Sequence, residues 1–246
     1  DDAYPGKSCR AFRWHTAFRF NKTRAGRPVI RLVARLVLVL SLASAIVQAG
    51  GISAKESRWT FNVYLDDSRI GYHDYRLVEG ADGVRRIEAE ARFDVKFLFV
   101  NAFRYRHEMA ETWDGDCLVD VEARTNSNGK KTRIEGQLTD AGFLVEAGDA
   151  AEQLGQCVMT FAYWNPEFLN ADRLLNPQTG EFLDVEIEPL RSETLVLNGR
   201  DIDAVGYQIE ARDLTVRVWY SEADQRWVAL ESPTKGGRVL RYELST

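Results

Sequence analysis

Ile87–Phe99 reads IEAEARFDVKFLF, and this stretch decides the fold class of the chain. Its odd positions are apolar throughout, whereas its even positions from Glu88 to Lys96 are all charged. A period of two places the apolar side chains on one face of an extended strand. The stretch therefore predicts a long β-strand that buries one face and exposes the other.

The same alternation recurs in other runs along the chain, and polar turn sequences stand between the runs. The apolar positions of the runs are Phe61/Val63/Leu65, Val119/Val121/Ala123, Leu183/Val185/Ile187, Val205/Tyr207/Ile209/Ala211, Val216/Val218/Tyr220 and Leu240/Tyr242/Leu244. The turn sequences are Asp66-Asp67, Ala81-Asp82-Gly83, Asp114-Gly115-Asp116, Asn128-Gly129, Ala141-Gly142, Asn198-Gly199 and Gly236-Gly237. This pattern is typical of an antiparallel meander.

A sheet of ten or so strands with one apolar face must curl on itself, or wrap around something, to cover that face. We therefore expect an all-β fold, in which an antiparallel meander forms a barrel or a strongly curved half-barrel. After removal of the leader described below, residues 50–246 are enough for a single antiparallel β domain with a real core.

One segment, 148–180, breaks the period of two. Asn165 is a good helix N-cap, Pro166 suits the first helical position and Glu167 favours the positive end of the helix dipole. These residues predict a short helix from about Pro166 to Leu174. The aromatic cluster around it needs an apolar surface to rest on, so we expect a lid segment that either closes one end of the barrel or gates a ligand.

The composition is that of a water-soluble globular protein, with 45% apolar and 28% charged residues among 246. Residues 1–49 carry nine of the 32 Lys and Arg residues but two of the 37 Asp and Glu residues, so the rest of the chain has a net charge of −12. An acidic body without a basic stripe repels polyphosphate. We therefore predict no nucleic-acid partner.

The N-terminal region contains a signal-peptide pattern. Leu36–Ala49 reads LVLVLSLASAIVQA, which is uncharged, follows Arg31 and Arg35, and ends in a small-x-small sequence before Gly50. This pattern predicts a signal peptide over 29–49 with cleavage after Ala49, and hence a periplasmic or otherwise exported protein. The alternative is a membrane anchor, but fourteen helical residues span about 21 Å, less than the ~30 Å hydrocarbon core.

Residues 1–28 have neither a Met nor a hydrophobic period. Two interpretations stay open for them, namely translated sequence upstream of the true start and a disordered basic tail. In either case we expect no more than transient contact between the exported protein and a membrane.

Two polar residues in the run from Phe103 to Trp113 occupy positions that the alternation predicts to be buried. His107 and Glu111 share the apolar face of this run, about 13 Å apart along an extended strand. One interpretation is that they flank a ligand or a water, and the other is that neighbouring groups satisfy each of them in the core. Neither His73 nor His107 has HxH or HExxH spacing, so we predict no metal. No cofactor motif is present either, and we predict no cofactor.

Cys117 and Cys157 are the only cysteines after the predicted signal peptide. In an oxidising compartment a disulfide between them is one interpretation, and inert core thiols are another. The third, Cys157 as a nucleophile paired with His107, requires a low-pKa thiolate that the surrounding sequence does not suggest. GxSxG, GxGxxG, Walker and CxxC motifs are absent from the sequence, so we assign no catalytic residue.

Two stretches carry a family resemblance, TFAYWNPEFLNADRLLNPQTGE (Thr160–Glu181) and WYSEADQRWVALESPTKGGRVLRYEL (Trp219–Leu244). With them the chain resembles an uncharacterised bacterial family of exported proteins that carry a domain of unknown function. WTFNVYLDDSRIGYHDYRL (Trp59–Leu77) and FRYRHEMAETWDGDCL (Phe103–Leu118) agree with this resemblance. More loosely, the chain is similar to the half-barrel of periplasmic lipoprotein carriers. The resemblance implies a fold and a compartment but no catalytic residues.

Together these observations predict a non-enzymatic cell-envelope protein that binds an apolar or lipid-like molecule in its curved sheet. The alternatives are a structural or protein-binding envelope module and a hydrolase-type enzyme that uses His107 and Glu111. The predicted ligand-binding side chains come from the apolar strand faces and the lid, and they are Phe97, Phe99, Tyr105, His107, Glu111, Phe161, Tyr163 and Trp164. The sequence does not predict an oligomeric state.

Overall fold

The computed structural model of the chain describes residues 54–97, 100–234 and 236–245, which belong to one compact unit. The predicted signal peptide and leader lie outside these ranges. Phe99 also lies outside these ranges, and the side chain of Phe97 is not described; both are predicted ligand-binding residues. Within the described ranges no helix is long and apolar enough to cross a membrane.

The described residues form one antiparallel sheet of fifteen strands, more than the ten or so expected. The additional strands are mostly short ones that lack a clear alternation. The strands are β1 (Lys55–Leu65), β2 (Ser68–Glu79), β3 (Val84–Phe97), β4 (Val100–Asp114), β5 (Cys117–Ser127), β6 (Lys130–Thr139), β7 (Gly142–Ala147), β8 (Ala150–Gln153), β9 (Arg173–Leu175), β10 (Phe182–Pro189), β11 (Glu193–Leu197), β12 (Arg200–Ala211), β13 (Leu214–Ser221), β14 (Trp227–Pro233) and β15 (Val239–Leu244).

Two meanders are joined in the middle of this sheet. Strands β1 to β8 follow one another on one side, and β15, β14, β13, β12, β10 and β9 follow on the other, with β1 paired to β15. In the described part of the chain the outermost strands β8 and β9 do not pair with each other, so the sheet is not closed. Strand β11 lies off this path and pairs with β12. The predicted all-β antiparallel meander is confirmed, and of the two predicted forms, a barrel or a strongly curved half-barrel, the closed barrel is not observed.

The alternation that predicted the central strand is observed in β3. Ile87, Ala89, Ala91 and Phe93 are all buried, whereas Glu88 is exposed. Neighbouring strands place their own apolar residues on the same face, because cross-strand neighbours in register point the same way. One face of the sheet is therefore continuous and apolar, as the sequence predicted.

The alternation of buried and exposed residues in β5 changes phase at a position that no sequence feature indicates. Thr112 faces Asp120 across the β4–β5 pair, but Trp113 faces Leu118, so Val119 is an extra, bulged residue. Leu118 is fully buried and Val119 only half-buried. The expected inward position of Val119 was therefore wrong, because a one-residue bulge moves the inward face to the next residue.

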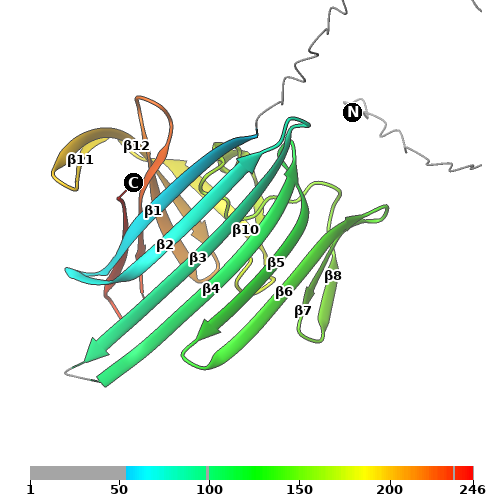
Figure 1. The fold of residues 1–246 in the computed structure, drawn as a ribbon, viewed down its shortest axis with the longest axis horizontal. Coiled ribbons are helices and arrows are strands. Elements are labelled where there is room, and N and C mark those ends of the chain that lie inside the picture. The colour runs from blue at the N-terminus through cyan, green and yellow to red at the C-terminus, as the bar shows by residue number, and fades with distance from the viewer. Residues whose placement is uncertain (1–53, 98–99, 235, 246) are drawn as a thin grey trace, which may run out of the picture. The chain divides into compact units, whose positions relative to one another are not determined.

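The sheet bends sharply around its β1–β15 junction. Tyr75 on β2 and Trp227 on β14 are three strand spacings apart in the sheet order, about 14 Å on a flat sheet. Their ring centroids are 5.3 Å apart. Figure 1 shows the same bend, with β1–β6 as one broad twisted layer in front of β10. The apolar faces of the two meanders therefore meet in a shared interior.

The segment between β8 and β10 fills this interior, but it does not contain the predicted helix. Pro166–Asn170 is a single 3-10 helix, and the Asn165 side chain accepts a hydrogen bond from the Glu167 amide at 3.3 Å, as an N-cap does. The helix ends because Ala171 is extended and the next residues pair with β10 as strand β9. The prediction was correct at the N-cap and wrong about the length and type of the helix.

Candidate functional site

A cavity of about 220 Å³ lies in the shared interior. Its walls come from the inward faces of β2 and β4, from β13–β15 across the bend, and from the segments 160–164 and 176–178. Most of the lining side chains are aromatic or aliphatic. The bend and the inner segment together make the cavity, since the lining strands are separated in the sheet order.

A row of polar side chains lies on the inner face of three strands and extends from the cavity wall into the core. His73 on β2 faces Ala91 on β3, Ala91 faces His107 on β4, and His107 faces Thr125 on β5. All four residues are buried. His73 and His107 line the cavity, whereas Ala91 and Thr125 do not.

His73 is held by its neighbour two residues along the same strand. The Tyr75 hydroxyl lies 3.1 Å from His73 Nδ1, and the two rings stack with centroids 4.2 Å apart. His73 Nε2 has no hydrogen-bond partner among the described residues. Burial, and secondarily the nearby His107, keep the pKa of His73 well below its ordinary value. The imidazole is therefore neutral at neutral pH.

His107 forms its hydrogen bond with Thr125, on the side of the row away from His73. Its Nδ1 lies 2.9 Å from the Thr125 hydroxyl oxygen. Burial lowers the pKa of His107 to about 4. The second imidazole of the cavity wall is also neutral at neutral pH.

Glu111 lies on the same face of β4 but is not paired with His107. Glu111 Oε2 accepts a hydrogen bond from Trp113 Nε1 at 3.0 Å, whereas Oε1 has no partner among the described residues. Burial raises the pKa of Glu111 to about 7, although hydrogen bonds from Thr160 and Trp113 oppose the rise. No hydrogen bond joins Glu111 to His107, and Glu111 does not line the cavity.

The predicted ligand-binding residues are distributed around this cavity in two groups. His107, Phe161, Tyr163 and Trp164 line it. Tyr105 lies beside it, where its ring stacks on Phe93 at 5.0 Å and its hydroxyl donates to Gln178 Oε1 at 2.7 Å. Several lining residues were not predicted from the sequence, and they include His73, Tyr75, Trp227 and Tyr242. His73 and Tyr75 are two residues apart on β2 and therefore point to the same, inward face.

The inner segment is anchored to the sheet by the predicted disulfide, which is confirmed. Cys117, at the start of β5, is bonded to Cys157. Next to it the Leu118 amide donates to the Val158 carbonyl at 3.0 Å. Cys157 is therefore not a free thiol, and it is not available as a nucleophile.

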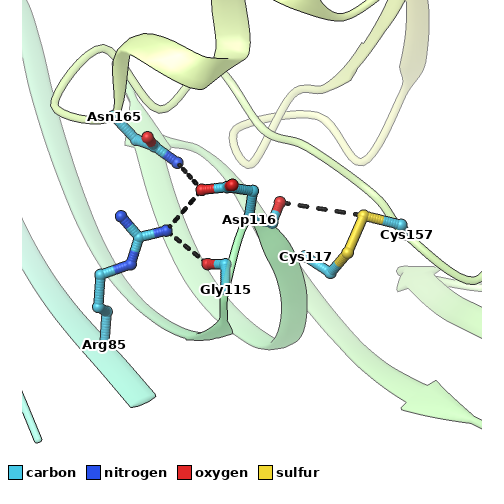
Figure 2. Close-up of a disulfide and its surroundings, with 6 residues drawn as sticks. All are labelled: Arg85, Gly115, Asp116, Cys117, Cys157 and Asn165. Atoms are coloured by element: carbon cyan, nitrogen blue, oxygen red, sulfur yellow. Dashed lines mark hydrogen bonds and ion pairs between the residues drawn. A yellow bond between two sulfur atoms is a disulfide. The ribbon is translucent and has the colours of Figure 1, made fainter. Parts of the chain in front are cut away.

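A polar cluster lies beside the disulfide, at the turn between β4 and β5. Figure 2 shows the Asp116 carboxylate between Arg85 Nη2, at 3.0 Å, and Asn165 Nδ2, at 3.4 Å. The Arg85 guanidinium also lies over the Trp164 ring, 5.0 Å from its centroid. These contacts fix the inner segment at the end of the cavity where Trp164 stands. Across the described residues no cluster of His, Cys, Asp or Glu has the arrangement of a metal site.

The fold and the cavity define a class of all-β proteins in which an open antiparallel sheet bends around a small interior space. Within that class the chain belongs to the family described as Domain of unknown function (DUF6134), which it matches over residues 61–245. No curated protein matches the chain.

Among solved structures, the chain is similar to a β-barrel-like protein from Brucella abortus with the domain of unknown function DUF1849. The TM-score is 0.57 at 10% sequence identity, over 78% of this chain and 96% of the other. At this identity the similarity supports the fold alone.

Proposed function

We propose that this chain is a non-enzymatic protein of the cell envelope that binds an apolar or lipid-like molecule in the interior of a strongly curved half-barrel. The observation that carries the proposal is the cavity of about 220 Å³ between the two meanders, which is lined mostly by aromatic and aliphatic side chains. An apolar cavity of ~150 Å³ is large enough to hold a benzene ring. This cavity therefore suits one ring or a short stretch of alkyl chain rather than a whole lipid.

The lining of the cavity supports binding rather than catalysis. Ligand pockets are typically apolar with a few placed polar groups, and here two neutral imidazoles stand among aromatic rings. A general acid–base pair would need its two groups within hydrogen-bond reach of each other or of one water. His107 and Glu111 have separate partners, Thr125 and Trp113.

The envelope location is supported by two independent features. The Cys117–Cys157 disulfide is the kind of bond that persists in exported proteins. The signal-peptide pattern that ends at Ala49 points to the same route.

The proposal is tested by identifying small molecules that remain bound to the protein after purification. We expect native mass spectrometry of the exported protein, purified without detergent, to detect a small apolar molecule in complex with it. Leu240→Trp should abolish the complex, because Leu240 is a half-buried residue of the cavity wall and the larger indole would occupy the space.

Val239→Trp is the matched control. Val239 precedes Leu240 on β15, does not line the cavity and is 38% exposed, and successive strand residues point to opposite faces. This variant should therefore keep the complex. A clean apo mass for the wild-type protein, or an identical complex in both variants, would contradict the proposal and favour a structural or protein-binding module.

A further inference from the structure

We infer that the projecting end of the β3–β4 hairpin, together with the adjacent β5–β6 turn, docks the protein reversibly on an anionic phospholipid bilayer. The described residues of this surface are 94–95, 102–106 and 126–131, and we refer to them as the hairpin end. The inference goes beyond the proposed function and does not depend on the cavity, because it concerns a different part of the sheet.

The β3–β4 hairpin is longer than the strands on either side of it. On one side β2 pairs with β3 as far as Phe93, and on the other side β5 pairs with β4 as far as Tyr105. Val95 and Phe103 face each other beyond these positions, and in the described part of the chain no third strand pairs with either of them. Figure 1 shows this end of β3 and β4 extending past β2 and β5. The hairpin therefore projects from the sheet.

The projecting part carries the apolar face of the sheet beyond the core. Phe93 is 6% exposed, and Val95, two residues further along the strand, points to the same face. Val95 is half-buried, and its partner Phe103 is 36% exposed. An aromatic ring that enters the boundary between headgroups and acyl chains is stabilised there, so an exposed Phe103 suits contact with a bilayer.

The hairpin end is basic, although the protein as a whole is acidic. Its cations are Arg104, Arg106, Lys130 and Lys131, and its one carboxylate is Asp94. Asp94 lies 3.6 Å from Arg104 and 2.8 Å from Arg106. Lys130 and Lys131 are exposed and have no ion-pair partner among the described residues. The hairpin end therefore has a net charge of +3, whereas residues 50–246 together have −12.

Backbone pairing holds the lysines beside the arginines. The Asn128 amide, in the β5–β6 turn, donates to the Arg104 carbonyl at 2.7 Å. Arg106 faces Asn126 on β5, and Asn126 faces Lys131 on β6. Neighbouring strands are about 4.8 Å apart, so Arg106 and Lys131 are separated by about 10 Å. The cations come from two hairpins, and strand pairing assembles them into one surface.

A bilayer that contains anionic lipids matches this combination of groups. Lysine and arginine side chains are attracted to its negatively charged headgroups, and the exposed aromatic ring adds apolar contact below the headgroups. The same surface repels the acidic remainder of the protein. The charge distribution therefore orients the protein with the hairpin end toward the bilayer.

The test measures co-sedimentation of the protein with vesicles of phosphatidylcholine alone and with mixed vesicles of phosphatidylcholine and phosphatidylglycerol. We expect the mixed vesicles to bind the protein at least about tenfold more tightly, because only they carry a net negative charge. Raising the NaCl concentration from about 50 mM to about 500 mM should remove most of this binding, because salt screens exposed charges.

The first pair of variants tests the cations. Lys130→Glu combined with Lys131→Glu should weaken binding to the mixed vesicles about tenfold or more, since two attractive charges become repulsive. Arg86→Glu combined with Arg200→Glu is the control with the same change in net charge. Both of these arginines are exposed and lie outside the hairpin end, on β3 and β12, so the control should bind almost as well as the wild type.

The second pair tests the apolar contact. Phe103→Ser should weaken binding to the mixed vesicles severalfold and leave its salt dependence unchanged, because the substitution removes an aromatic ring and no charge. Val196→Ser is the control, since Val196 is 68% exposed on β11 and also exchanges one exposed apolar side chain for serine. This control should bind like the wild type.

Several outcomes would overturn the inference. They are an absence of binding to the mixed vesicles, equal binding to both kinds of vesicle, equal losses in the two double variants, and tighter binding to a short DNA duplex than to the mixed vesicles. Circular dichroism checks that each variant is folded, and vesicle composition and salt dependence decide the result on the wild-type protein if a variant is not. None of these outcomes changes the proposed function, since native mass spectrometry detects the cavity ligand separately.

Discussion

Glu111 is a buried carboxyl group, and its burial changes the pH at which it loses its proton. It is 2% exposed, and burial raises its pKa from 4.5 to about 7. Between these values the folded chain keeps a proton that the unfolded chain has lost. The contribution of Glu111 to stability is therefore greatest at low pH and is lost as the pH rises through 7.

We predict that Glu111→Gln removes this pH dependence. The amide oxygen can still accept from Trp113 Nε1 but carries no charge at any pH. A shift from 4.5 to about 7 corresponds to roughly 3 kcal/mol. The free energy of unfolding of the variant, relative to wild type, should therefore rise by about that amount between pH 4.5 and pH 8 in urea titrations.

The control for this prediction is Glu108→Gln. Glu108 is on the same strand but exposed, so its variant should follow the wild-type pH profile. The two buried imidazoles, whose lowered pKa values make the protein less stable as the pH falls below 6.5, are present in both variants and in the wild type. A constant difference between Glu111→Gln and wild type at all pH values would contradict the prediction.

The inner segment between β8 and β10 depends on side-chain contacts and the disulfide for its stability. It has one short 3-10 helix and the three-residue strand β9, so few of its backbone groups are satisfied by regular structure. Its stability comes from the buried side chains of Phe168 and Leu174, from the Tyr220 hydroxyl that donates to the Tyr163 carbonyl at 2.7 Å, and from the disulfide. The cavity wall depends on these contacts, since the segment supplies part of that wall.

We predict that replacing both Cys117 and Cys157 with Ala lowers the free energy of unfolding by about 4 kcal/mol. The bond joins residues 40 positions apart, and closing a loop of that length restricts the unfolded chain by this amount in the chain-entropy description. Chemical denaturation of the double variant measures the loss. Wild-type protein treated with a reductant should unfold at the same denaturant concentration as the variant, and no change on reduction would count against the prediction.

At the scale of the whole molecule, the bent sheet has two apolar clusters that are not independent. One gathers residues of β1, β3 and β12–β15, with Phe61 and Trp227 at ring centroids 4.1 Å apart. The other gathers residues of β3–β7 around Trp113 and Phe143. Half-buried Trp59, Tyr75 and Met159 pack against both clusters. The two meanders therefore share one continuous interior.

We predict that the two meanders unfold together. Backbone amides of β6 and β13, one in each meander, should exchange with solvent at the same free energy, equal to that from chemical denaturation, because each cluster loses packing partners when the other opens. Native-state hydrogen exchange measures this directly. Protection of β6 that persists while β13 exchanges freely would mean two separately stable halves.

The sequence alone determines the fold class, because the period of two in Ile87–Phe93 and the turn sequences between strands are local features of the sequence. Asn128-Gly129 and Asn198-Gly199 illustrate this, since all four residues have positive φ at tight turns between paired strands. The N-cap at Asn165 was likewise readable from the sequence, whereas the disulfide was one of three interpretations that the sequence left open for Cys117 and Cys157.

Only the tertiary structure decided which polar groups share a cavity. The sequence left open whether His107 and Glu111 flank a ligand or are satisfied separately by neighbouring groups. Strand register places His107 in line with His73 and Thr125, and Thr125 is its hydrogen-bond partner. The bend at the β1–β15 junction then brings Trp227 and Tyr242 to the same wall. The curvature arises from packing between residues far apart in the chain, such as Tyr75 and Trp227, and no local pattern encodes it.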